Sequence, residues 1–236
     1  MKKIKGLFPV YFIVIIGLLL SAIYGSYAAT VISENAPVKN RKCIVIDAGH
    51  GGVDGGAVSC TGVLESQVNL EIALKLNDLC HLLGLDTKMI RTTDCSIHTQ
   101  GSSIAAKKVS DLKERVRITN ETENAVIVSI HQNKYVQSQY SGAQVFYAPT
   151  EGSSILAKSI QDTYLRCLNS GSNRKIKKAD GVYLMQHITC PGVLVECGFL
   201  SNPEEEARLR NKSYQQKLCC VIASACSGYL NAEPTA

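Results

Sequence analysis

Short apolar runs alternate with longer amphipathic segments along the chain from residue 40 onward. Apolar runs of the kind found in strands buried on both faces lie at 43–46, 125–130 and 192–195, and more edge-like strands are predicted at 143–147 and 181–186. Helical periodicity predicts helices at 65–83, 111–123, 153–169 and 214–229. Strands separated by helices predict an α/β fold, with a single-domain, mostly parallel twisted sheet and helices on both faces.

Polar residues indicate where individual helices begin. Asp111 and Glu114 have the spacing of a capping box, so a helix is predicted to start at Asp111. Residues 201–203 (Ser-Asn-Pro) are typical of the start of a short helix, because proline suits the first helical position and serine or asparagine the cap. The polar segment 92–110 is interpreted as a long loop that either gates a cleft or is disordered.

The N-terminus has the organisation of an export signal. Three lysines within the first six residues precede an apolar run at 7–23, and residues 26–28 (Ser-Tyr-Ala) offer a small-x-small cleavage site. This run is longer than most signal-peptide cores and shorter than a comfortable membrane span. The chain is therefore predicted to be exported, with a signal peptide or N-terminal membrane anchor at 1–29, a linker at 30–41, one folded domain at 42–231 and a tail at 232–236.

The formal charge of +5 belongs mainly to the N-terminus. Residues 1–29 hold three of the 25 basic residues and none of the 20 acidic ones, so the rest of the chain is nearly neutral. Because a general grip on nucleic acid requires a clustered basic face, this composition argues against nucleic acid as a partner.

Ten cysteines in an exported chain raise the question of disulfides, but no two form a CxxC pair. Most lie inside apolar stretches. Cys80, Cys219, Cys220 and Cys226 are predicted to be small residues in helix cores, and Cys43 and Cys197 to pack in or beside strands. One or two bridges and a fully reduced set both remain compatible with the sequence.

Three of the buried strands lead to a chemically competent side chain: His50, His131 and Glu196. Sites in open α/β sheets form outside the carboxyl ends of the strands, so these three side chains are expected to converge. Two histidines suit zinc, but a catalytic zinc typically takes three protein ligands. A third ligand is therefore required.

Glu65 and Glu71 are the candidates for this third ligand. At 100° per residue, the apolar positions of the predicted helix fall within about 60° of Glu65, whereas Glu71 lies at about 240°. Glu65 therefore opens the inward face of the helix and is preferred, although a carboxylate in a first helical turn can also act only as a cap.

The glycine-rich loop at 49–56 has neither the dinucleotide-binding nor the P-loop spacing, because position 54 is aspartate. Its glycines are interpreted as letting the backbone wrap closely around a metal ligand. Asp54 is expected either to orient His50 or to cap a turn. Asn133 is expected either to bind substrate or to shape the turn after its strand.

Four stretches resemble the zinc-dependent N-acetylmuramoyl-L-alanine amidase family, which hydrolyses the lactyl amide of peptidoglycan. They are residues 46–52 (IDAGHGG), 64–65 (LE), 129–133 (SIHQN) and 195–202 (VECGFLSN), in that order. The resemblance runs from Lys42 to about Leu230 and implies that 42–231 is a catalytic domain. It also implies that His50, Glu65 and His131 bind Zn²⁺ and that Glu196 is the general base.

Within this family, the chain most resembles the single-domain sporulation and germination-specific cortex amidases. Residues 51–59 and 69–76 and the lack of wall-binding repeats carry this likeness. It implies a role in stripping peptides from spore-cortex muramic acid on the way to muramic-δ-lactam, in functional pairing with a muramic acid deacetylase. The expected location is extracytoplasmic, between mother cell and forespore, and an accessory activating protein is an expected partner.

Other functions share part of this set of residues. A zinc carboxypeptidase typically has a His-x-x-Glu ligand pair, and position 53 here is valine. A vegetative autolysin with the same chemistry, or a non-catalytic wall-binding or regulatory protein with the same fold, remains an alternative. The basic run at 174–178, with Arg174, Lys175, Lys177 and Lys178, is interpreted as a solvated loop or as a contact for acidic peptide stems or wall polymers.

Overall fold

The computed structural model describes Ser21, residues 41–169 and residues 171–232. Except for Ser21, the predicted signal peptide or anchor lies outside these residues, as do nearly all of the linker and the end of the tail. Across the ranges that are described, no helix combines the length and the apolar character that crossing a membrane requires. The fold below is that of the compact unit that begins at Arg41.

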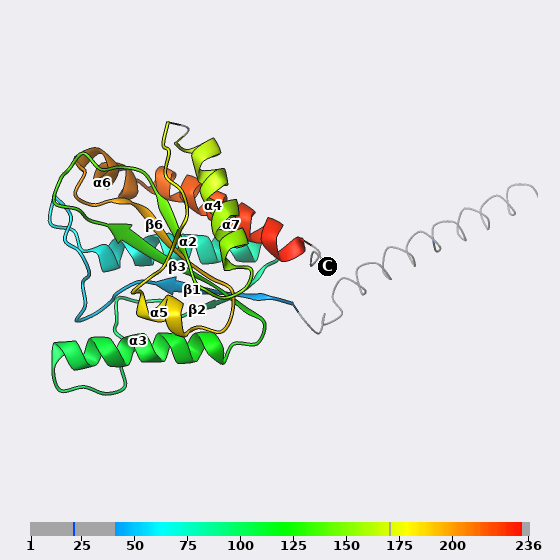
Figure 1. Ribbon diagram of the computed structural model, residues 1–236, viewed down its shortest axis with the longest axis horizontal. Coiled ribbons are helices and arrows are strands. Elements are labelled where there is room, and N and C mark those ends of the chain that lie inside the picture. Colours follow the sequence, from blue (N-terminus) through cyan, green and yellow to red (C-terminus); the bar gives the residue numbers. More distant parts are fainter. Residues whose placement is uncertain (1–20, 22–40, 170, 233–236) are drawn as a thin grey trace, which may run out of the picture. The chain divides into compact units, whose positions relative to one another are not determined.

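Six strands form one twisted sheet in the order β2-β1-β3-β6-β4-β5 (Figure 1). The strands are β1 (Cys43–Ala48), β2 (Asp86–Met89), β3 (Ala125–Asn133), β4 (Gln144–Tyr147), β5 (Lys177–Lys178) and β6 (Gly192–Phe199). Neighbouring strands are parallel except β4 and β6, which are antiparallel. The predicted mostly parallel α/β sheet is confirmed.

Helices cover both faces of this sheet (Figure 1). They are α2 (Glu65–Leu82), α3 (Ile104–Asn120), α4 (Ser153–Cys167), α5 (Tyr183–His187), α6 (Pro203–Leu209) and α7 (Lys212–Asn231). Alternate side chains of a strand point to opposite faces, so β1 contributes Ile44 and Ile46 to a core shared with α2, α4 and α7, and Val45 to a second core shared with α5. Burial on both faces explains why β1, β3 and β6 read as continuous apolar runs.

The start of α3 corrects the capping-box prediction. The helix begins at Ile104, and the hydroxyl of Ser103 accepts a hydrogen bond from the backbone N–H of Ala106 at 3.2 Å. Asp111 lies in the middle of the helix, where its carboxylate pairs with the Arg115 guanidinium at 2.6 Å. The predicted long loop therefore ends at Ser103, and Asp111 serves a buried ion pair rather than a cap. The Asn202 cap of α6 is confirmed, because its side chain accepts from the N–H groups of the first turn.

The segment 181–186 forms most of α5 and not the predicted strand. Gly181 turns the chain with a φ of 80°, and the consecutive residues Leu184 and Met185 are both buried. A helical turn can direct neighbouring residues into one core, whereas a strand would send them to opposite faces. Strands β2 and β5 were not predicted, because both are short and composed largely of polar residues.

All ten cysteines lie in the described part of the chain, and all are free thiols. Cys80, Cys219 and Cys226 are buried as predicted for helix-core residues, and Cys197 is buried in β6. Cys220 is exposed, so its predicted place in a helix core is wrong. Burial raises the pKa of the Cys80 thiol to about 11, which keeps it protonated and unreactive at neutral pH.

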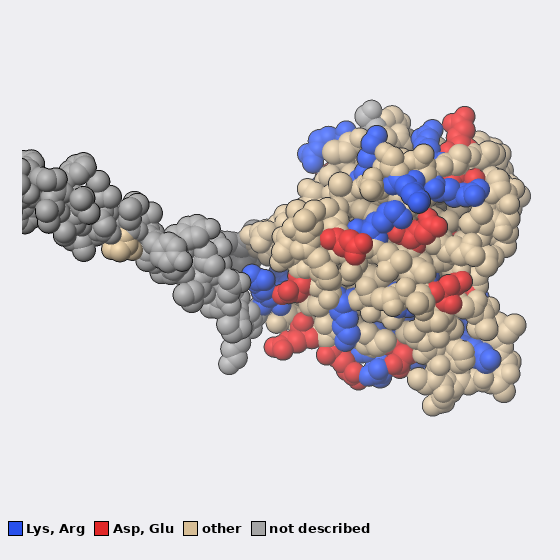
Figure 2. Space-filling model, turned by 180° about the vertical axis from the view of Figure 1, so that it is seen from behind, with Lys and Arg blue, Asp and Glu red and all other residues tan. Residues whose placement is uncertain are grey.

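Basic and acidic side chains are interspersed on the face of the molecule that Figure 2 shows. Charged side chains also pair along the helices of the described chain, including Lys158 with Asp162 at 2.6 Å and Arg208 with Glu204 at 3.5 Å. Pairs of this kind place positive and negative charges side by side on the surface. Each pair contributes little to stability because both groups are solvated.

Candidate active site

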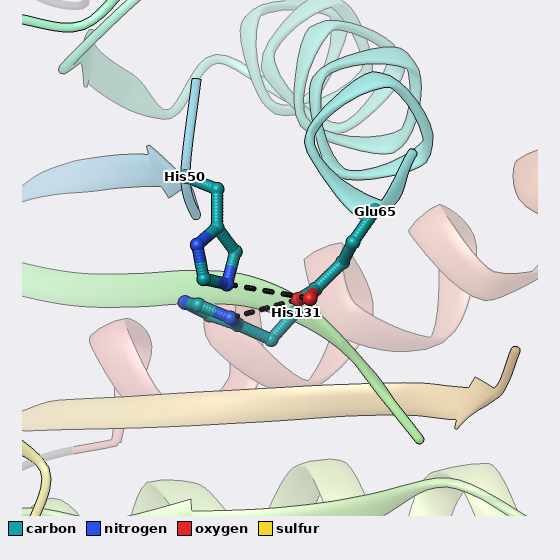
Figure 3. Close-up of side chains that lie close together, drawn as sticks. All are labelled: His50, Glu65 and His131. Carbon is teal, nitrogen blue, oxygen red and sulfur yellow. Dashed lines mark hydrogen bonds and ion pairs between the residues drawn. The ribbon is translucent and has the colours of Figure 1, made fainter. Parts of the chain in front are cut away.

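Three side chains from distant parts of the sequence converge near the carboxyl ends of strands β1 and β3 (Figure 3). His50 follows β1, Glu65 is the first residue of α2, and His131 lies in β3. One potential ligand atom from each lies within 4.8 Å of the others. The convergence expected from the strand ends and from the inward face of the 65–83 helix is therefore observed.

The Glu65 carboxylate is buried and fully hydrogen-bonded. Oε1 lies 3.1 Å from His131 Nδ1 and accepts from the backbone N–H of Gln132 at 3.1 Å. Oε2 lies 3.3 Å from His50 Nε2 and accepts from the backbone N–H of Ala57 at 2.9 Å. Burial alone would raise the pKa of Glu65, but the hydrogen bonds to the two histidines outweigh it and hold the pKa well below its usual range.

His50 is oriented from its other side by Asp54. Its Nδ1 atom lies 2.9 Å from the Asp54 carboxylate, which also pairs with Lys108 of α3 at 2.8 Å. Burial would lower the pKa of His50, but Glu65 and Asp54 outweigh it and raise the pKa to about 9. With Nδ1 held by a carboxylate, Nε2 is directed to the point between the three groups, as carboxylate partners of metal-binding histidines do.

The glycines of the 49–56 loop leave room for the converging side chains. A Cβ atom at Gly49 would lie 2.2 Å from His131 Nε2, and one at Gly56 would lie 2.6 Å from Glu65 Oε2. Gly56 also has a φ of 68°, which residues with a side chain rarely adopt. These contacts support the interpretation that the loop wraps closely around the site.

Two buried arginines fix the backbone beneath the site, and neither was singled out from the sequence. Arg115 donates to the carbonyl oxygens of Ala48 at 2.9 Å and His50 at 2.7 Å, and pairs with Asp47. Arg91 donates to Ala48 O at 2.8 Å and also binds the carbonyl groups of Gly49 and Ser66. This network holds His50 at a φ of 61°, a conformation that is uncommon for residues other than glycine.

Asp47 is the anionic partner in this network. Burial would raise its pKa, but Arg115 and a hydrogen bond at 2.6 Å from the Ser129 hydroxyl outweigh burial and hold the pKa below its usual value. The sequence carried one signal of this network: an aspartate directly after the apolar run 43–46 must find a partner when it is buried. The partner itself lies 68 residues further along the chain.

Glu196 lies beside the three converging side chains but has a different environment. It pairs in register with His131 across β3 and β6, and β6 continues past it to Phe199. Its Oε2 atom is buried and has no hydrogen-bond partner among the described residues. Burial raises the pKa of Glu196 to about 7, with Glu65 adding to the shift and the two histidines opposing it. Glu196 is thus poised to exchange a proton near neutral pH.

Asn133, Glu71 and two other histidines have contacts of their own. Asn133 ends β3, beyond an irregularity in its register with β6, and its backbone carbonyl accepts from the Leu200 N–H at 2.8 Å. His187 is exposed and stacks on Tyr183, and His81 is exposed at the end of α2. Glu71 is exposed, as its position on the outer face of α2 predicted.

Residues of the cluster also line a small cavity. A volume of about 210 Å³ lies beside the two histidines, bordered by His50, Asp54, Lys108, Arg115 and His131. Two imidazoles and one carboxylate are a donor set known from catalytic zinc sites. Glu196 Oε2 is a further buried polar atom, without a hydrogen-bond partner among residues 41–169 and 171–232. The residues present therefore fit a divalent ion with an activated water.

An α/β sheet that presents two histidines, a fixed carboxylate and a second carboxylate of raised pKa defines a site of the hydrolytic class. The chain belongs to the N-acetylmuramoyl-L-alanine amidase family called Amidase_3, whose model matches residues 44–227. It is a hydrolase of the peptidoglycan cell wall, as the resemblance of its motifs implied.

Similar proteins include amidases of Bacillus subtilis and Clostridioides difficile. The germination-specific N-acetylmuramoyl-L-alanine amidase of Bacillus subtilis is 40% identical over 183 residues, which are 77% of this chain and 76% of that protein. The CwlD amidase of Clostridioides difficile, solved in complex with the GerS lipoprotein, superposes with a TM-score of 0.77 at 37% identity, covering 82% of this chain and all of that one. A second amidase, from Clostridium difficile 630, has a TM-score of 0.72 at 31% identity and covers 83% of this chain and all of that one.

Proposed function

We propose that this protein is a zinc-dependent amidase that hydrolyses the bond between N-acetylmuramic acid and L-alanine in peptidoglycan. The observation that carries the proposal is the convergence of His50, Glu65 and His131, with ligand atoms within 4.8 Å of one another. Beside them lies Glu196, whose Oε2 atom has no hydrogen-bond partner in the part of the chain that the structure describes. Membership of the amidase family supplies the reaction, and the donor set supplies the choice of zinc.

The three converging residues would hold the ion. His50 would offer an imidazole whose Nδ1 is held by Asp54, His131 would offer the second imidazole, and Glu65 would offer a carboxylate that stays ionised. When bound, zinc polarises a carbonyl group and lowers the pKa of its water toward about 7. The backbone beneath His50 is held by Arg115, so the imidazole does not need to reorganise during turnover.

Glu196 acts first as general base and then as general acid in this reaction. Water adds to the lactyl carbonyl carbon while the Glu196 carboxylate accepts one of its protons. The protonated Glu196 then donates this proton to the nitrogen of L-alanine, and the carbon–nitrogen bond breaks. The products are a lactyl carboxylic acid on the sugar and a free amino group on the peptide, and Glu196 returns to its ionised form.

The proposed setting is the spore cortex, where peptide removal is a step towards muramic-δ-lactam and implies functional pairing with a muramic acid deacetylase. Similarity to the germination-specific amidase of Bacillus subtilis supports this setting over a vegetative autolysin. We propose an extracytoplasmic location between mother cell and forespore. An accessory activating protein is proposed as a partner, because the similar CwlD amidase was solved in complex with a lipoprotein.

Product analysis tests the proposed reaction. Purified protein supplied with zinc is expected to release peptide stems from muropeptides and leave the glycan intact, as read by mass spectrometry, while chelator-treated protein is expected to release none. Cleavage between sugars would refute the reaction. For the cortex role, a deletion strain is expected to lack muramic lactam in its spores, and persistence of the lactam would refute that role.

A further inference from the structure

The row of site residues continues along the sheet beyond Glu196. His131 pairs with Glu196 across β3 and β6, and Glu196 pairs with Gln144 across β6 and β4. Residues paired in register project from the same face of a sheet, so these three side chains form one row. Along this row, Gln144 is the residue next to Glu196 on the side away from His131.

Gln144 connects this row to a groove beside β4 and β5. Its Nε2 atom donates to the carbonyl oxygen of Lys175 at 2.7 Å, and its Oε1 atom accepts from Arg174 at 3.1 Å. The groove has a volume of about 620 Å³, and its lining includes Tyr140, Ser141 and Lys177. A buried side chain of the groove thus lies next to Glu196 in the sheet.

Arg174 builds the wall of this groove. Its Nε atom donates to the Ser141 carbonyl at 2.6 Å, and its guanidinium lies 4.7 Å from the ring centroid of Phe199. The Phe199 ring in turn stacks on Tyr140, with centroids 6.2 Å apart. Through these contacts with Ser141, Gln144 and Phe199, Arg174 holds the two sides of the groove together.

The lysines are the charges available to a ligand. Lys175 and Lys177 are exposed on the groove, and no ion pair to either occurs within the ranges 41–169 and 171–232. Lys178 is also exposed, on β5 at the edge of the sheet. Two uncompensated ammonium groups beside a polar groove favour a ligand with carboxylates.

We infer that this groove binds the acidic peptide stem of the substrate, an inference that rests on the proposed function. The substrate has two arms that meet at the reacting amide. The N-acetylated sugars are uncharged, whereas the stem peptide carries free carboxylates, so only the peptide arm is complementary to Lys175 and Lys177. This pairing places the stem over β4 and β5 and fixes the direction in which the substrate crosses Glu196.

Charge reversal in the groove tests this inference through the Lys175→Glu/Lys177→Glu double variant. Two muropeptides are compared, one with free stem carboxylates and one with those carboxylates amidated. The wild type is expected to prefer the free form. In the double variant KM for the free form is expected to rise about tenfold, because two exposed charge contacts are replaced by repulsions, while kcat stays within about twofold.

Lys217→Glu is the matched control, because Lys217 is an exposed lysine of α7 that lies outside the groove. It is expected to keep the wild-type KM and the wild-type preference. Unchanged thermal unfolding of all variants verifies that they are folded. A double variant that keeps the preference for free carboxylates, or that loses kcat with KM unchanged, would overturn the inference.

Binding of the free stem peptide separates this inference from the proposed function. If the wild type with zinc cleaves neither muropeptide, the proposed function fails. Nuclear magnetic resonance titration with an unattached acidic stem tripeptide then decides the groove. Shifts of backbone amides at 174–178 that disappear in the double variant support the inference, and an absence of shifts there in the wild type refutes it.

Discussion

Glu65 and Glu196 are two carboxylates of one site near the carboxyl ends of the strands, and their environments are opposite. Glu65 is surrounded by donors, including the N–H groups of Ala57 and Gln132, and its pKa is held well below the usual range. Glu196 has a buried oxygen with no partner among the described residues, and its pKa is raised to about 7. The difference suits Glu65 to remain ionised and Glu196 to accept and donate a proton.

The largest effect is expected from removing the carboxylate that accepts and donates the proton. Glu196→Gln should lower kcat by about 10²–10⁴-fold, the usual contribution of a positioned general base, with the bound zinc unchanged. Steady-state kinetics and metal analysis of the same preparation measure both quantities. Glu204→Gln, at an exposed position of α6, serves as the control and should match the wild type. A Glu196→Gln protein of full activity would assign the proton to another group.

The backbone that carries His50 depends on the buried side chain of Arg115. Arg115→Met leaves Asp47 and Asp111 without their guanidinium, so the free energy of unfolding should fall by about 3–5 kcal/mol. Urea unfolding measures this loss. Arg117→Met, two residues along on the exposed side of α3, should change stability little. Equal stability of the two variants would mean that the network does not hold the loop.

A smaller effect is expected from the carboxylate that orients His50. Asp54→Asn should weaken zinc binding about 10–100-fold, the usual cost of losing a hydrogen-bonded partner of a metal-binding histidine. Competition with a chromophoric chelator measures the affinity, and Asp162→Asn on the exposed face of α4 is the control. Unchanged affinity in Asp54→Asn would show that Asp54 only caps the loop.

The pH dependence should follow the raised pKa of Glu196. The reaction requires the ionised carboxylate, so kcat/KM should fall about tenfold per pH unit below pH 7 and level off above it. A pH profile measures this limb, and the residual activity of Glu196→Gln should lack it. If the limb lay near pH 4.5, the ordinary value of a glutamate, burial would not be tuning the base.

The sequence predicted the parts of the molecule that local patterns encode. β1, β3 and β6 are buried on both faces, so their apolar runs identified them, and the residues near their ends led to His50, His131 and Glu196. Glu65 was found because helical geometry separates an inward from an outward glutamate, and Glu71 is exposed. Local patterning is sufficient when burial follows the period of the element.

Parts that depend on distant partners could not be predicted in the same way. Asp111 resembles a helix cap, but it pairs with Arg115, and the cap of α3 is Ser103. Arg91 and Arg115 bind backbone carbonyl groups of residues 48–50, and Arg115 also binds the Asp47 carboxylate. Such contacts leave no sequence spacing to recognise. The apolar pair in α5 suggested a strand because a short run does not distinguish the two elements.

Metal content tests the central claim most directly. Inductively coupled plasma mass spectrometry on purified wild type, Glu65→Ala, His131→Ala and Glu71→Ala should find one zinc ion per chain in the wild type and in Glu71→Ala. Glu65→Ala and His131→Ala should hold almost none. Equal zinc content in all four proteins would contradict the claim that His50, Glu65 and His131 form the metal site.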